Sequence, residues 1–143
     1  MRDEMSLDPY YQTCSRANAE CQGRITWEHV WIYAGKQVNE IWAIIPLCEY
    51  HHSVNWHQDG HGLNKKINEA ISLARATVED LKKYPTKTWL LLIREAITTS
   101  EKHVIGSSSE GITSSLRKLI TQFSHPEERS TKSATSSGPT ASQ

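Results

Sequence analysis

The pattern of apolar and polar positions predicts two strands in the first third of the chain. Residues 24–31 alternate loosely between large apolar and polar side chains, and residues 41–47 form a short run rich in β-branched residues. Both patterns are typical of strands. A break at 34–36 separates them, so we expect an antiparallel ribbon whose loop of roughly ten residues exceeds a common hairpin turn. Pro46 indicates an edge position or a strand end, because proline has no N–H to donate.

Beyond the second strand the apolar spacing becomes helical. Residues 48–56 show no alternation and suit the start of a helix. Pro85 predicts the end of a longer helix over 64–84, and Thr86 is a plausible N-cap for a second helix that runs to Lys102. The first of these helices carries its apolar side chains at Ile67, Ala70, Ile71, Ala74, Val78 and Leu81. We interpret the two as an antiparallel pair that supports the strands or forms a homodimer face, and the plainest interpretation is a helical core.

The composition changes after about residue 103. The sequence GSSSEG has the composition of a linker. Residues 111–123 predict a weak helix, and the Ser-, Thr-, Pro- and charge-rich chain from Ser124 predicts disorder. The expected fold class is α+β, with a flexible N-terminus at 1–12, a folded domain at 13–103, and a linker, weak helix and disordered tail at 104–143.

Charge and hydropathy narrow the choice of partners. The formal net charge is zero and 37% of residues are hydrophobic. No apolar run of about 18 residues predicts a membrane span, and the N-terminus lacks the apolar core of a signal peptide. We therefore expect a cytoplasmic protein with no membrane partner. Any contact with nucleic acid must depend on a local basic patch.

Three cysteines and a histidine have the spacing of a metal site. Cys14 and Cys21 are separated by six residues, and Cys48 and His51 by two. Three thiols cannot all pair within one chain, and a Cys₃His set is common in structural zinc sites. The fourth ligand could instead be His52. The alternative is three unrelated buried thiols beside a surface histidine.

The dipeptide Glu28-His29 offers a second kind of chemistry. A carboxylate and an imidazole near a divalent cation form a hydrolytic set, in which the metal polarises a phosphoryl oxygen and a neutral histidine deprotonates water. On a strand the two side chains point to opposite faces, but at a strand end both could approach one site. Taken alone, such a pair is usually a solvated surface dipeptide.

The order of these residues, in WEHV followed by AIIPLCEYHH, resembles the HNH endonuclease family and its ββα-metal motif. The resemblance covers residues 14–57. It implies that Glu28 and His52 are ligands of a catalytic Mg²⁺ or Mn²⁺ and that His29 is the general base. It also implies that a structural zinc is held by Cys14, Cys21, Cys48 and His51, with His51 in place of the usual fourth cysteine.

Two positions depart from the family pattern. The asparagine that orients the catalytic histidine is replaced by Ala43, and Asn39 could substitute only if the loop folds differently. A further metal ligand is expected where Trp56 stands, so that His57 or Asn55 would take the role. His61 is a weaker candidate, and the alternative for His57 and His61 is that both are ordinary solvated histidines.

The resemblance therefore implies a phage-type HNH protein that acts as a metal-dependent DNA endonuclease or nickase. Arg16, Arg24 and Lys36 are candidate DNA contacts, although each one singly could be an ordinary solvent-facing charge. The alternative is a catalytically weak or inactive zinc-stapled module that binds nucleic acid or protein. A third interpretation is an adaptor that works through its Ser/Thr-rich tail.

Overall fold

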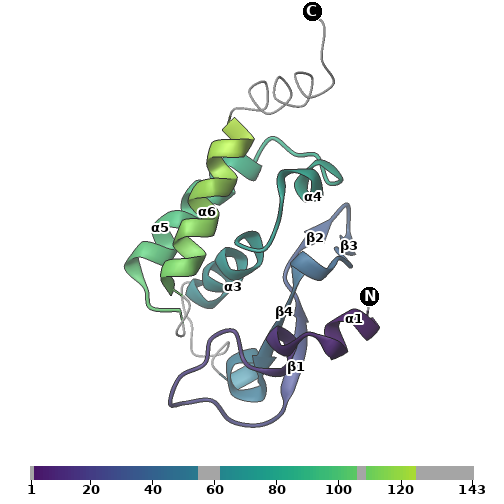
Figure 1. Ribbon diagram of the computed structural model, residues 1–143, viewed down its shortest axis with the longest axis vertical. Coiled ribbons are helices and arrows are strands. Elements are labelled where there is room, and N and C mark those ends of the chain that lie inside the picture. Colours follow the sequence, from purple (N-terminus) through teal and green to yellow (C-terminus); the bar gives the residue numbers. More distant parts are fainter. Residues whose placement is uncertain (1, 55–61, 106–108, 125–143) are drawn as a thin grey trace, which may run out of the picture.

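The computed structural model describes residues 2–54, 62–105 and 109–124. The fold is α+β, as expected. A ribbon of two strands and a short N-terminal helix lie at one end, and three longer helices lie at the other (Figure 1). Those candidate site residues that the structure describes lie in and around the ribbon.

The ribbon pairs β1 (Ile25–His29) with β4 (Ile44–Cys48) in antiparallel register, which confirms the predicted strand pair. His29 lies opposite Ile44 at one end of the ribbon. Residues 41–43, expected to begin the second strand, form a 3₁₀ helix instead. The carbonyl of Pro46 accepts a hydrogen bond from the backbone N–H of Ser15 at 2.9 Å, so the cysteine-bearing loop runs along the outer edge of β4.

A small hairpin, β2 (Ile32–Tyr33) and β3 (Lys36–Gln37), projects from the connection between the two strands. Its two turn residues, Ala34 and Gly35, both have positive φ, at 53° and 81°. Two consecutive residues in this region form the turn that matches the twist of a tight hairpin. The phenol of Tyr33 donates to the carbonyl of Pro85 at 2.8 Å, which ties the hairpin to the helical part.

The predicted helix over 64–84 is wrong as a single element. It is divided into α3 (Leu63–Leu73) and α4 (Val78–Lys82). Thr77, between them, is extended and begins α4 with a capping box. Its hydroxyl accepts from the N–H of Asp80 at 3.1 Å, and its own N–H donates to the Asp80 carboxylate at 2.9 Å. These two hydrogen bonds satisfy backbone and side-chain groups at the first turn of a new helix. The apolar residues therefore keep their helical spacing across Thr77 although the helix itself is interrupted there.

The next helix, α5 (Trp89–Lys102), begins after Thr88 and not after Thr86; the hydroxyl of Thr86 instead accepts from the N–H of Thr88 at 3.4 Å. It packs against α3, the first part of the segment expected to pair with it, and against α6 (Ser109–Ser124). Figure 1 shows α5 and α6 side by side along the length of both helices. The α6 residues Ile112, Leu116 and Leu119 belong to the same hydrophobic core as the rest. The folded part therefore extends to Ser124, beyond the expected boundary at residue 103.

The N-terminal residues also differ from the expected flexible segment. They form α1 (Arg2–Leu7) and a 3₁₀ helix (Pro9–Gln12). Met5 and Tyr11 are buried against Ile44. The Tyr11 hydroxyl lies 2.6 Å from the carbonyl of Ile41 and 3.0 Å from that of Ile44, so this segment is fixed to the start of β4.

The core joins the ribbon to the helices through large aromatic side chains. Trp31 and Trp42 are buried, and both stack edge-on against Trp89 of α5. These tryptophans are therefore core residues. Within the described ranges, no helix has both the length and the apolar character needed to cross a membrane.

Candidate metal centre and the adjoining polar pairs

Four potential metal ligands converge where the end of β4 meets the loop before β1. Cys14 and Cys21 come from that loop, Cys48 ends β4, and His51 lies in the π-helical turn Tyr50–Val54. Their ligand atoms all lie within 4.8 Å of one another. The Nδ1 atom of His51 is 3.5 Å from the sulfur of Cys14, 3.6 Å from that of Cys21 and 3.2 Å from that of Cys48.

These distances fit a tetrahedral zinc ion. Zinc–sulfur bonds of about 2.3 Å and zinc–nitrogen bonds of about 2.0–2.1 Å place neighbouring sulfur and nitrogen ligands about 3.5 Å apart. The three cysteines are free thiols. They can therefore hold a metal ion together with His51, as the spacing predicted. Because His51 is the histidine of this cluster, His52 is left for another role.

Burial and hydrogen bonding influence the ligands in different ways. Burial raises the pKa of the Cys14 thiol to about 12. Burial also acts to raise the pKa of Cys48, but hydrogen bonds from the backbone of His51 and Gln22 and from the neighbouring thiols bring it below its usual value. Burial, followed by the charge of Arg16, lowers the pKa of His51 and favours its neutral form. Neutral imidazole and thiolate are the forms that bind metal, and a bound cation offsets the cost of the buried thiolates.

The loop that carries the first two cysteines is shaped by backbone contacts to sulfur. The N–H of Arg16 lies 3.4 Å from the Cys14 sulfur, and the N–H of Asn18 lies 3.5 Å from the Cys21 sulfur. Gly23 has a φ of +85°, and a side chain there would collide with that of Glu49. This position therefore requires glycine where the loop passes the turn after β4.

The residue after His51 faces the ribbon and not the thiols. The Nε2 atom of His52 lies 2.6 Å from a carboxylate oxygen of Glu28. The side chains of Glu28 and His52 are 28% and 41% exposed, so solvent ions and ligands can reach them. The structure thus brings together the two residues that the resemblance assigned to a catalytic metal.

The next residue of the strand makes a different pair. The Nε2 atom of His29 lies 3.2 Å from the side-chain oxygen of Asn39. Ala43, which occupies the family's asparagine position, is fully buried, and its carbonyl accepts from the N–H of Val30 at 2.9 Å. Asn39 reaches the imidazole because the β2–β3 hairpin and the 3₁₀ turn bring the loop back to the end of β1.

The two pairs lie on opposite faces of β1, because side chains alternate along a strand. In the part of the chain that the structure describes, the Cys₃His cluster is the one group of three or more metal-ligating side chains. Glu28 and His52 are thus two ligands without a described third. The predicted third-ligand candidates Asn55 and His57, together with His61, lie outside the described residues.

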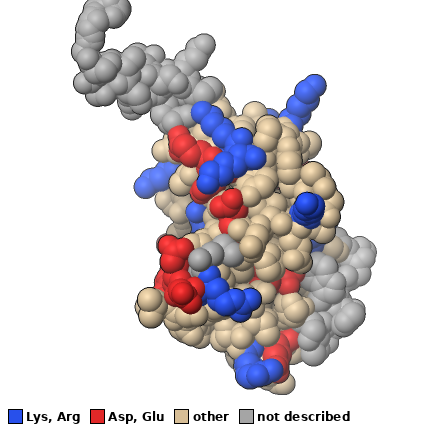
Figure 2. All heavy atoms as spheres, turned by 90° about the vertical axis from the view of Figure 1, so that its right-hand side faces the viewer, with Lys and Arg blue, Asp and Glu red and all other residues tan. Residues whose placement is uncertain are grey.

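The candidate DNA contacts are partly engaged in the protein. The guanidinium of Arg16 donates to the side chain of Asn64 at 2.5 Å, and Arg24 lies 3.5 Å from the carboxylate of Glu49. Lys36 is exposed on the hairpin. Figure 2 shows basic and acidic side chains interspersed on the face it presents, in agreement with a net charge of zero.

A smaller cavity of about 350 Å³ lies beside His29 and Asn39. One of its walls is formed by Arg2 of α1, a residue that sequence reasoning did not select. No motif marks Arg2, and the segment that carries it was expected to be flexible. Arg2 lines the cavity only because α1 packs on the ribbon, and the sequence pattern does not predict that packing.

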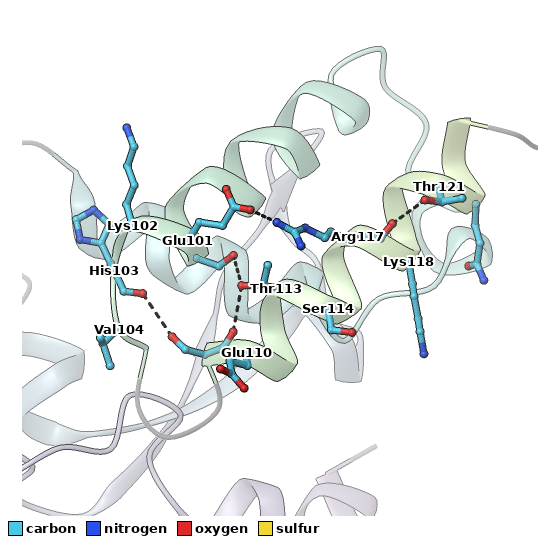
Figure 3. A pocket seen from close by; sticks show the side chains of 13 residues that line it. Glu101, Lys102, His103, Val104, Glu110, Thr113, Ser114, Arg117, Lys118 and Thr121 are labelled. Atoms are coloured by element: carbon cyan, nitrogen blue, oxygen red, sulfur yellow. Dashed lines mark hydrogen bonds and ion pairs between the residues drawn. The ribbon is translucent and has the colours of Figure 1, made fainter.

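A larger cavity, of about 870 Å³, lies elsewhere. It is a groove between α5 and α6 (Figure 3). Its polar groups contact one another: Arg117 pairs with Glu101, and the Thr113 hydroxyl donates to Ser100 at 2.8 Å. None of the predicted site residues lines this groove.

Comparisons of the chain with protein-family models, with curated proteins and with solved structures found no significant match.

Proposed function

We propose that this protein is a metal-dependent DNA endonuclease or nickase of the HNH type, with a structural zinc beside its active site. The observation that carries the proposal is the contact between Glu28 and His52, 2.6 Å apart, next to a cluster that suits zinc. His29 follows Glu28 directly and has its own polar partner. This is the set of residue types and positions that the HNH resemblance implies.

Glu28 and His52 would hold the catalytic Mg²⁺ or Mn²⁺. When bound, such an ion polarises the phosphoryl group and stabilises the leaving oxygen. Both side chains are partly exposed, so a phosphate can approach them from solvent. Glu28 and His52 would supply one carboxylate oxygen and one imidazole nitrogen to the ion.

His29 would act as the general base. Its Nε2–H donates to the Asn39 oxygen in the tautomer that satisfies this contact, which leaves the lone pair on Nδ1. That nitrogen takes a proton from water as the water oxygen bonds to phosphorus and the bond to the leaving oxygen breaks. Attacking and leaving oxygens lie on opposite sides of the phosphorus in an in-line displacement. His29 is the last residue of β1, so a phosphate at Glu28 and His52 would reach the Nδ1 atom of His29 around the end of the strand.

A plasmid-nicking assay with added Mg²⁺ or Mn²⁺ tests the proposal. We expect the full chain to convert supercoiled DNA to the open-circular form. His29→Ala should slow this by about 10²–10⁴-fold, the usual contribution of a general base. His103→Ala is the matched control, because His103 lies at the end of α5 outside the site, and its rate should be unchanged. Equal background cleavage by the wild type and His29→Ala would remove the enzyme assignment.

The second candidate function is a zinc-stapled module that binds nucleic acid or protein without cutting. The observation in its favour is that Ala43, which is fully buried, stands where the HNH family has the asparagine that orients the catalytic histidine. Fluorescence anisotropy with a labelled duplex, measured beside the nicking assay, separates the two functions. Binding with no metal-dependent cleavage supports the module, whereas cleavage that requires His29 supports the enzyme.

A further inference from the structure

The cavity beside His29 is lined by α1, by β1 and by two residues further along the chain. Ile25, Trp27 and His29 alternate along β1 and therefore point to the same face. Helix α1 covers this face and contributes Arg2 and Met5. The remaining lining residues are Asn39 and Ile44.

The walls of this cavity differ in chemistry. The Trp27 ring forms one wall, and its indole N–H donates to the carbonyl of Tyr11 at 3.2 Å, which fixes its orientation. The guanidinium carbon of Arg2 lies 5.7 Å from the centre of the Trp27 ring. Of the described residues that line the cavity, Arg2 and His29 are the ionisable ones and none carries a carboxylate. An aromatic wall beside cationic and polar groups suits a ligand with a flat ring and an anion.

The size of the cavity selects among such ligands. At about 350 Å³ it lies at the low end of small-molecule sites. A base within a duplex keeps both faces covered by its neighbours, so it can contact Trp27 only after leaving the stack. A single nucleotide whose base has left the stack is small enough for the cavity and has a ring face free to contact Trp27.

We propose that this cavity binds one unstacked nucleotide of a DNA strand, with the base against Trp27 and its phosphate toward Arg2 and His29. The identification of the strand as DNA rests on the proposed nuclease function. Arg2 is then a substrate-binding residue contributed by α1, and the preferred substrate is single-stranded, frayed or mismatched at the cleavage position. A duplex would first have to release one base from its stack.

The test is a titration of the full chain with thymidine 5′-monophosphate, without added Mg²⁺ or Mn²⁺, followed by the NMR signal of the Trp27 indole N–H. Trp27→Phe identifies this signal. Inorganic phosphate and thymidine, titrated separately, report the two halves of the ligand. Arg2→Ala removes the cation, Arg2→Lys keeps its charge, and Arg94→Ala removes an exposed arginine of α5 as a matched control.

We expect the monophosphate to shift the Trp27 signal at lower concentrations than either half alone. Arg2→Ala should weaken this binding by about tenfold, the loss of one charge-assisted contact. Arg2→Lys should recover part of the binding and Arg94→Ala should not change it. No shift of the Trp27 signal, or equal effects of Arg2→Ala and Arg94→Ala, would overturn the proposal.

The nicking assay tests DNA cleavage independently of nucleotide binding in the cavity, so each assignment can fail without the other. If the monophosphate binds at Trp27 but the protein cuts no DNA, the cavity assignment stands and the nuclease assignment fails. If the protein cuts DNA through His29 but Arg2→Ala changes neither nucleotide binding nor the KM for a single-stranded substrate, the nuclease assignment stands and the cavity assignment fails.

Discussion

Removal of one cysteine should reveal whether a metal ion stabilises the fold. Cys48 is 2% exposed, ends β4 and faces the His51 nitrogen at 3.2 Å, so it links the ribbon to the turn that carries both histidines. Cys48→Ser replaces the thiol with a hydroxyl, which is a harder ligand on a shorter side chain and binds zinc less well than a thiolate. We expect purified wild-type protein to contain one zinc per chain and Cys48→Ser to contain much less.

The size of the effect follows from the local structure. All five residues of β1 are only partly buried, whereas β4 is buried throughout and belongs to the main hydrophobic core. The loss of a metal ion should therefore act mainly on β1 and on the loop that carries Cys14 and Cys21. A structural zinc contributes about 10–16 kcal/mol of apparent binding free energy in small metal-folded peptides. That is as large as the whole unfolding free energy of an ordinary domain, about 5–15 kcal/mol. Loss of the ion should therefore strongly destabilise β1 and the cysteine-bearing loop, while β4 stays packed in the core.

The assay is thermal unfolding followed by tryptophan fluorescence, with and without a chelator, together with metal analysis by mass spectrometry. The chelator should lower the Tm of the wild type strongly and that of Cys48→Ser hardly at all, because the variant has little metal to lose. The exposed variant Ser114→Ala, in α6, is the matched control and should respond as the wild type does. A zinc-free wild type, or a chelator effect of equal size in Cys48→Ser, would refute the reasoning.

Three further predictions concern the helices. Leu116→Ala in α6, at a fully buried position, should lower the unfolding free energy by about 2–5 kcal/mol in urea titrations; a change near zero would mean that α6 does not belong to the core. Thr77→Ala removes the cap of α4 and should cost about 1 kcal/mol, whereas no loss would show that the cap is not needed. Burial raises the pKa of the Glu69 carboxyl in the folded state. Between the ordinary pKa of a glutamate and this raised pKa, the folded state binds more protons than the unfolded state, so the unfolding free energy falls as pH rises through that range. Glu69→Gln should remove this dependence in urea titrations across that pH range and be more stable than the wild type at neutral pH, and an unchanged pH profile would contradict the assignment.

The sequence predicted the parts of the fold that depend on local pattern. Residues 25–29 and 44–48 form an antiparallel pair as expected, because loose alternation in the first and a β-branched apolar run in the second favour strands. The spacing of the cysteines and histidines predicted the cluster of Cys14, Cys21, Cys48 and His51, but it left His52 as an alternative fourth ligand. The spacing of cysteine and histidine residues can be read directly from the sequence. A two-stranded ribbon offers few other arrangements in which these side chains could meet.

The parts that the sequence did not predict depend on longer-range contacts. The apolar spacing from 64 to 84 continues across Thr77, so periodicity could not show the break that the capping box creates. Among the described residues 2–12, only Met5 and Tyr11 are buried, which is too few apolar residues for the sequence to predict a folded segment. The contact of Asn39 with His29 depends on how the hairpin loop returns to β1, which no spacing along the chain records.

Consecutive residues of one turn, His51 and His52, face different neighbours: the first faces the thiols and the second faces Glu28. A shift of that turn would carry both imidazoles with it. In the proposed enzyme, removal of the thiol-bound ion would abolish cleavage even when manganese is in excess. A reconstitution protocol must therefore restore zinc first and only then titrate the second cation.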